Sequence, residues 1–263
     1  MLNKLLKYDL KYMIKNMSVF YALSIFFAIL TRILFSLNQS VIVNIISQIS
    51  VGCMFAMIIN TLINTVMRSW VRFRDSIYKD ESYLTHTLPV TKNDIYNSKF
   101  IQTLIFFVIG FVVILLSLFI AYYTKERWLL LKNVISGITT GLNMNTTLFV
   151  IGFISVVFLE IFNALQCGFL GIILGYKKNN NKIVFSVIFG FVSYLLAQSM
   201  VLLLVFIVGL FDKSIMDLFK STILLDTNSF KLLVLLSILI YALIIWLMSI
   251  MCKKELSKGV NIE

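Results

Sequence analysis

Residues 68–100 read RSWVRFRDSIYKDESYLTHTLPVTKNDIYNSKF and interrupt a sequence that is otherwise apolar. This stretch contains the single proline, Pro89, and the single histidine, His86, of the 263-residue chain. Long apolar runs flank it on both sides. We therefore interpret residues 68–99 as a large polar loop between two membrane helices. A loop of this length and amphipathic character is typical of a contact with another molecule in the water phase.

The composition is typical of integral membrane proteins. Apolar residues make up 60% of the chain and charged residues 13%, whereas soluble domains are about 45–50% apolar. The net charge of +11 would favour nucleic-acid binding in a soluble protein. In a membrane protein it is typical of loops held beside anionic lipid, so we expect no nucleic-acid partner.

Six runs are long enough to cross a bilayer, which requires about 20 apolar residues. The sequence therefore predicts an all-α membrane protein with six transmembrane helices, organised as one transmembrane domain over residues 1–263. The connections 122–146 and 211–230 each have room for a short amphipathic helix. The six predicted spans cover residues 18–37, 41–67, 100–121, 147–175, 184–210 and 231–252.

Residues 1–17 are predicted to form an interfacial amphipathic helix ahead of the first span. One face is apolar and the other is basic, and this pattern is typical of a helix whose apolar face contacts acyl chains while its lysines lie among headgroups. The apolar run that follows is too long for a signal peptide. The apolar face contains Leu2, Leu5, Leu6, Leu10, Met13 and Met17, and the basic face Lys4, Lys7, Lys11 and Lys15.

The distribution of basic residues predicts that both termini lie in the cytoplasm. With the N-terminus inside, 16 lysines and arginines fall on inside segments, six on outside segments and Arg32 within a span. Cytoplasmic loops carry such an excess. The chain is therefore predicted to be a multi-pass protein of the cell membrane, with residues 68–99 as its largest cytoplasmic feature.

Sequence signals for catalysis are absent. The chain contains no GxxxxGK[ST] phosphate-binding loop and no HExxH zinc motif, and it has no carboxylate pair within a predicted span. The cysteines Cys53, Cys167 and Cys252 lie in or beside apolar runs without CxxC spacing, which indicates buried apolar side chains. We expect a protein that is not an enzyme and that holds no cofactor or metal of its own.

Two charged residues, Arg32 and Glu160, fall inside predicted spans, where a charge usually faces a partner or a wet cavity. Glu160, Asn163 and Gln166 are spaced to share part of one helix face. These four residues form a candidate translocation surface. The alternatives are helix packing and, for Arg32, extension of the side chain to the headgroups. In the same span Gly168, Gly171 and Gly175 favour close approach of another helix.

The end of the polar loop resembles a known family. Its pattern is similar to ExYLTxTLPV[ST] followed by SK at the next span, which occurs between the second and third spans of type-2 ATP-binding cassette (ABC) exporter permeases of low-GC Gram-positive bacteria. Thr91 with Asp94 three residues later also predicts the start of the next helix. The matching residues are Glu81, Tyr83, Leu84, Thr85, Thr87, Leu88, Pro89, Val90, Thr91, Ser98 and Lys99.

The resemblance implies that separate subunits form the transport pathway and hydrolyse ATP. Two permeases, identical or paralogous, form the pathway, and two separate ATPase subunits carry the ATP and Mg²⁺. A short coupling helix, expected at residues 80–88 and ended by Pro89, docks into a groove on the ATPase. The residues implied in docking are Asp80, Glu81, Tyr83, Leu84, Thr87, Leu88 and Pro89.

The sequence does not decide the substrate, and it leaves one alternative function. The apolar spans favour an amphipathic or lipid-like substrate, and the family resemblance points to a toxic or antimicrobial peptide. The alternative is an ATP-independent membrane protein, either a secondary carrier that uses Glu160 as a proton-coupled carboxylate or a non-transporting assembly partner. The absence of proline from the predicted spans counts against a carrier with broken helices.

Overall fold

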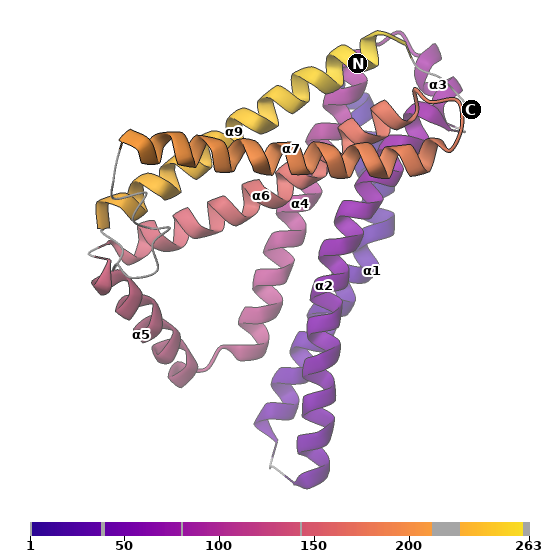
Figure 1. The fold of residues 1–263 in the computed structure, drawn as a ribbon. Coiled ribbons are helices and arrows are strands. Elements are labelled where there is room, and N and C mark those ends of the chain that lie inside the picture. The colour runs from indigo at the N-terminus through magenta and orange to yellow at the C-terminus, as the bar shows by residue number, and fades with distance from the viewer. Residues whose placement is uncertain (1, 38–39, 80, 143, 212–226, 260–263) are drawn as a thin grey trace. The chain divides into compact units, whose positions relative to one another are not determined.

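The computed structural model describes residues 2–37, 40–79, 81–142, 144–211 and 227–259, and all regular elements in these ranges are helices (Figure 1). Six of them are long and apolar enough to cross a membrane, which confirms the all-α, multi-pass prediction. The helices are α1 (Leu2–Ser36), α2 (Val41–Tyr78), α3 (Ser82–Thr87), α4 (Lys92–Tyr122), α5 (Lys125–Gly141), α6 (Thr146–Gly175), α7 (Lys182–Phe211) and α9 (Thr227–Ser257).

The helices form two compact units, with the boundary inside α5 between Trp128 and Leu129. In the first unit α1, α2 and α4 pack against one another, and α3 packs against the end of α2. In the second unit α6 packs against both α7 and α9, and α7 also contacts α9. The single transmembrane domain expected from the sequence stays a prediction.

Several helices are longer than the apolar runs that predict them. The second span is predicted to end at residue 67, but α2 continues to Tyr78, and α4 begins at Lys92 rather than at residue 100. Backbone hydrogen bonding continues whatever the side chains are, so a helix does not end where its sequence turns polar. The 38 residues of α2 span about 57 Å, which is well beyond a hydrocarbon core of about 30 Å.

The N-terminal segment differs from its prediction in two respects. Residues 1–17 do not form a separate helix, because α1 runs unbroken from Leu2 to Ser36. The expectation that the apolar face contacts acyl chains is wrong for Met13 and Met17, which are fully buried against Phe106 of α4. A helix packed on protein has the same apolar period as one lying on lipid, so periodicity could not distinguish the two. The lysines of the other face are exposed, as predicted.

Local signals set the ends of α3 and α4 as predicted. Thr91 caps α4, since its hydroxyl accepts from the Asp94 amide at 3.1 Å and donates to the Asp94 carboxylate at 2.8 Å. α3 ends at Thr87, two residues before Pro89. The connection 122–146 contains the helix α5. The short helix considered for residues 211–230 falls largely on residues 212–226, which lie outside the described part of the chain.

Close packing of α6 on α7 holds the second unit together, as the glycine spacing predicts. A Cβ atom placed on Gly171 would lie 2.5 Å from the Gly190 Cα atom and 2.6 Å from the Ser186 carbonyl oxygen of α7. One placed on Gly175 would lie 2.5 Å from the Ser186 Cα atom. Real Cβ atoms do not approach other atoms so closely, so the two backbones touch because side chains are missing.

Small hydroxyl pairs hold the helices of the first unit together. Ser24 of α1 and Ser117 of α4 are 3.0 Å apart through their hydroxyl oxygens, and Thr31 of α1 lies 2.9 Å from Ser50 of α2. All four side chains are buried. Hydroxyl groups that bond across helices stabilise packing in lipid, where hydrophobic burial between helices contributes little.

Candidate functional site

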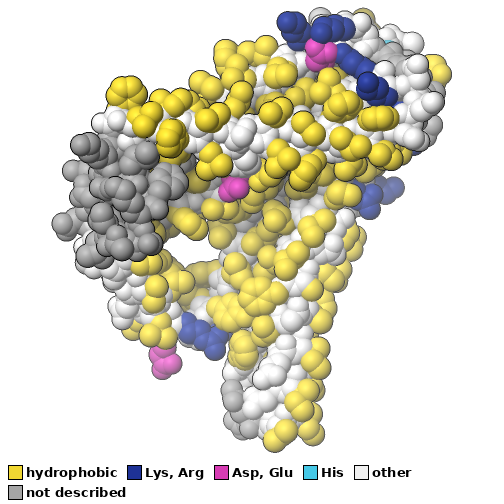
Figure 2. Space-filling model, viewed as in Figure 1, with side chains coloured by type: hydrophobic (Ala, Val, Ile, Leu, Met, Phe, Trp, Pro, Cys, Tyr) yellow, Lys and Arg dark blue, Asp and Glu magenta, His cyan; other side chains and the backbone are white. Residues whose placement is uncertain are grey.

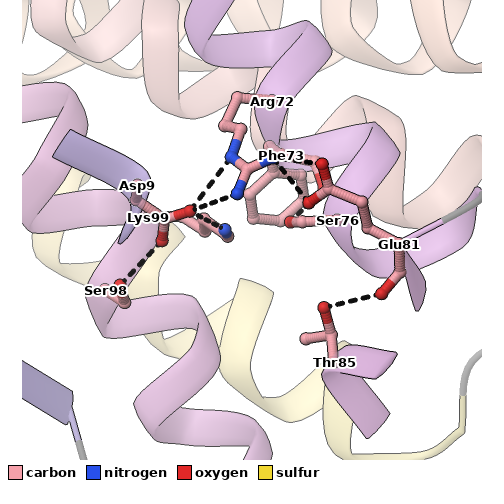
Figure 3. A network of polar contacts seen from close by, with 8 residues as sticks. All are labelled: Asp9, Arg72, Phe73, Ser76, Glu81, Thr85, Ser98 and Lys99. Atoms are coloured by element: carbon pink, nitrogen blue, oxygen red, sulfur yellow. Dashed lines mark hydrogen bonds and ion pairs between the residues drawn. The ribbon is translucent and has the colours of Figure 1, made fainter. Parts of the chain in front are cut away.

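A buried carboxylate, Asp9 of α1, joins the three long helices of the first unit (Figure 3). Only 1% of the Asp9 surface is exposed. Its Oδ1 atom accepts from Arg72 Nε at 3.0 Å and Nη2 at 2.9 Å, and Lys99 Nζ lies 2.5 Å from the same oxygen. Ser98 Oγ donates to Oδ2 at 2.9 Å. Because Arg72 is on α2 and the other two partners are on α4, one side chain links all three helices.

The network continues from Arg72 to Glu81, the residue just before α3. Arg72 Nη1 donates to both carboxylate oxygens of Glu81, at 2.7 and 2.5 Å, and the guanidinium lies 4.4 Å from the centre of the Tyr12 ring. With Asp9 and Lys99, the four side chains carry two positive and two negative charges. Burying a charge is costly unless it is paired, and here every buried charge has an opposite charge within bonding distance.

The inner face of α3 is held by hydrogen bonds near the end of α2. The Glu81 carbonyl accepts from both the amide and the hydroxyl of Thr85 at 2.9 Å (Figure 3). The Ser82 amide donates to the Lys79 carbonyl at 2.7 Å, and His86 Nε2 lies 3.1 Å from the Ile77 carbonyl oxygen. Ser82 and Thr85 are buried. The start of α3 is therefore fixed to α2 through backbone and side chain.

The outer face of α3 is apolar and exposed. Tyr83 is 65% exposed, Leu84 72% and Leu88 39%, and Thr87 and Pro89 are exposed beside them. These five residues all belong to the set predicted to dock an ATPase. Exposed apolar side chains on a helix that is fixed from behind form a rigid surface for a partner.

The remaining two residues of that predicted set differ from the other five. The Glu81 carboxylate forms an ion pair with Arg72, so it belongs to the internal network even though part of its side chain is exposed. Asp80 lies outside the described residues. A docking role for these seven residues stays a prediction.

Sequence reasoning missed the centre of the network. Asp9 lies in a lysine-rich helix, and a single carboxylate among lysines gives no sequence signal for a buried site. One signal was available: Leu5, Asp9, Met13 and Met17 recur every four residues, so the carboxylate shares the buried face. Its partner Arg72 was counted only as a basic residue for orientation, since nothing in a linear sequence joins positions 63 residues apart.

The four residues of the candidate translocation surface are divided between the two units. Arg32 is exposed at the end of α1 in the first unit, and Nη1 donates to the Tyr123 carbonyl at 2.5 Å. The other three belong to the second unit, where Asn163 and Gln166 are buried and Glu160 is exposed.

The two buried amides take part in packing within the second unit. Gln166 Nε2 donates to Ser249 Oγ of α9 at 2.9 Å, and Cys167 Sγ lies 3.9 Å from Asn163 Oδ1 one turn earlier on α6. The first contact joins α6 to α9 and the second stays within α6, and both side chains are buried, which favours the packing interpretation for Asn163 and Gln166. A translocation role for Glu160 and Arg32 stays a prediction.

The network contains ion pairs and hydroxyl groups, and each of its charged side chains lies within bonding distance of an opposite charge. In the described ranges no three histidine, cysteine, aspartate or glutamate side chains are grouped as they would be around a metal ion. Its geometry links α3 to the ends of three long helices.

No protein-family model, no characterised protein and no solved structure matches this chain. The comparisons therefore identify no family. The resemblance to exporter permeases is carried by residues 81–99 alone.

Proposed function

We propose that this chain is the transmembrane subunit of an ABC exporter, located in the cell membrane with both termini and residues 68–99 in the cytoplasm. One observation carries the proposal. α3 exposes Tyr83 and Leu84 while Glu81, at its start, is ion-paired to the buried network. A docking element needs both an exposed contact surface and a rigid connection to the membrane helices. The excess of basic residues on the inside segments supports the orientation.

In this function ATP and Mg²⁺ belong to a separate ATPase, and this chain converts the movement of that subunit into helix displacement. A push on α3 acts through Glu81 on Arg72 of α2. Arg72 transmits it to Asp9 of α1, and Asp9 in turn holds Lys99 of α4. Charged pairs this close resist separation in a poorly solvated site. A displacement of α3 caused by docking is therefore transmitted to α1, α2 and α4 together.

The transport pathway requires a second copy of the chain or a paralogue, as the family resemblance implies. The proposed substrate is amphipathic, and a toxic or antimicrobial peptide fits best. Hydrophobic side chains cover much of the visible surface of the long helices (Figure 2), and charged side chains in the predicted spans are few. Such surfaces suit a substrate with an apolar face better than a sugar or an inorganic ion.

The proposal predicts that Leu84→Asp releases the ATPase. Leu84 is the most exposed apolar side chain of α3, and a carboxylate placed in an apolar groove is left without a partner. We expect capture of the ATPase to fall at least about tenfold, as for a central interface residue. The measurement is affinity purification from mild detergent, with the partner identified by its nucleotide-binding motifs.

Asn93→Asp is the matched control, because it adds the same charge to an exposed position on the first turn of α4. Its ATPase capture should equal that of the unmodified chain, and both variants should reach the membrane at equal levels. Equal capture by Leu84→Asp and Asn93→Asp would contradict the proposal. So would labelling of residue 83 by a membrane-impermeant reagent added outside intact cells.

The second candidate function is a proton-coupled carrier that uses Glu160. Glu160 lies near the middle of α6 and is exposed, and a charge at that depth is usually functional. The two functions differ in what Glu160→Gln does to uptake of a fluorescent amphipathic peptide by inverted vesicles. For an exporter, uptake requires ATP in both the unmodified chain and the variant. Uptake that needs no ATP and is lost in Glu160→Gln would favour the carrier.

A further inference from the structure

Two arginines lie at the end of the first unit that is remote along the helices from the Asp9 network. Arg32 is near the end of α1, and its guanidinium donates to the carbonyl of Tyr123, just after α4. Arg127 lies with its guanidinium 5.1 Å from the Phe35 ring centre and 5.6 Å from that of Tyr122. Since Phe35 is one turn after Arg32 on α1, both guanidinium groups occupy the same end of the bundle.

Both arginines are exposed and have no acidic partner among the described residues. Neither forms an ion pair with any carboxylate in the described part of the chain, including Glu126, which is adjacent to Arg127 in sequence. Arg32 uses one of its donors on the Tyr123 carbonyl. Basic side chains are visible at the connection between α4 and α5 (Figure 2). Two positive charges with unused N–H groups are therefore presented together.

The position of these arginines corresponds to a membrane boundary. Along α1, Asp9 and Arg32 are separated by about 35 Å at 1.5 Å per residue, close to the thickness of a hydrocarbon core of about 30 Å. Aromatic rings cluster at the same level: Tyr123 lies between Phe119, at 4.5 Å, and Trp128, at 6.1 Å, measured between ring centres. Tyrosine and tryptophan are enriched at headgroup depth.

We propose that Arg32 and Arg127 form a binding site for the phosphate group of an anionic phospholipid. Guanidinium groups match phosphate oxygens in geometry and charge. The exposed side chains of Ile29 and Phe119 lie about one turn toward the membrane interior and provide apolar surface for the acyl chains. The site belongs to one bundle end and does not depend on the exporter function proposed above.

The test uses the full-length chain in vesicles that contain a phosphatidylglycerol with a photoreactive group beside the glycerol. After illumination, cross-links are mapped by peptide sequencing. We expect labelling within residues 29–37 and 119–128. The double variant Arg32→Gln/Arg127→Gln should lower this labelling at least about tenfold, since each basic residue near a membrane surface contributes appreciably to anionic-lipid binding.

Lys4→Gln/Lys7→Gln is the charge-matched control, because both lysines are exposed at the other end of α1. It should leave the labelling of residues 29–37 unchanged. Equal labelling of the unmodified chain and the arginine double variant would overturn the proposal. So would equal labelling by a phosphatidylcholine with the same photoreactive group. Loss of labelling on addition of millimolar inorganic phosphate would overturn the lipid assignment in favour of a soluble phosphate.

Discussion

Asp9→Asn should destabilise the first unit severely. Asparagine keeps the size of the side chain but removes the charge that faces both Arg72 and Lys99, whose ammonium is almost fully buried. Breaking a buried ion pair by removing one partner costs about 3–5 kcal/mol. We expect a free energy of unfolding reduced by that amount, measured by denaturant titration of the purified chain in detergent, and little folded protein at physiological temperature.

Two variants calibrate this result. Asp75→Asn removes a carboxylate from the half-exposed pair with Arg74, and pairs of this kind contribute at most about 1 kcal/mol. The exchange Asp9→Lys/Lys99→Asp restores the pair with residue 99 but places an ammonium against Arg72, so it should recover little stability. If Asp9→Asn were no more damaging than Asp75→Asn, the network would not hold the unit together.

Gly171→Ala is expected to separate α6 from α7. The added methyl group would overlap the Gly190 backbone and the Ser186 carbonyl oxygen, and neither can rotate away as a flexible side chain would. Forcing extra volume into a packed contact costs about 1–3 kcal/mol and occasionally more, and we expect the upper end of that range here. The measurement is the unfolding midpoint of the purified chain, followed by cysteine cross-linking between α6 and α7.

Gly137→Ala supplies the comparison, because a Cβ at this position on α5 would meet nothing within 4 Å. It should be neutral or slightly stabilising, as alanine favours helix over glycine by up to about 1 kcal/mol. Equal midpoints for the two variants would show that the contact between α6 and α7 is looser than described.

Hydropathy was sufficient to predict the six long helices, because an apolar run of about membrane thickness rarely forms any other structure. It could not locate the helix ends, since the α2 helix continues through Arg72 while the side chains turn polar. Local chemistry did better at one boundary: the Thr91 cap and the stop before Pro89 depend only on neighbours in sequence.

The candidate site was predictable only on its outer face. Tyr83 and Leu84 belong to a compact motif, so a resemblance could mark them. The inner face depends on Asp9 meeting Lys99, 90 positions later, and a single sequence contains no record of such a pairing. The spacing of apolar residues also could not show whether Met13 contacts lipid or protein, because both present similar apolar surfaces.

The order in which the network partners leave the ribosome has a consequence for biogenesis. Asp9 is synthesised first, yet its basic partners arrive only with the end of α2 and the start of α4. Until Arg72 has been translated the carboxylate lacks both of these partners, and the bundle of α1, α2 and α4 cannot close until Lys99 has been translated. Truncation before that residue should leave an unassembled intermediate that quality-control proteases recognise.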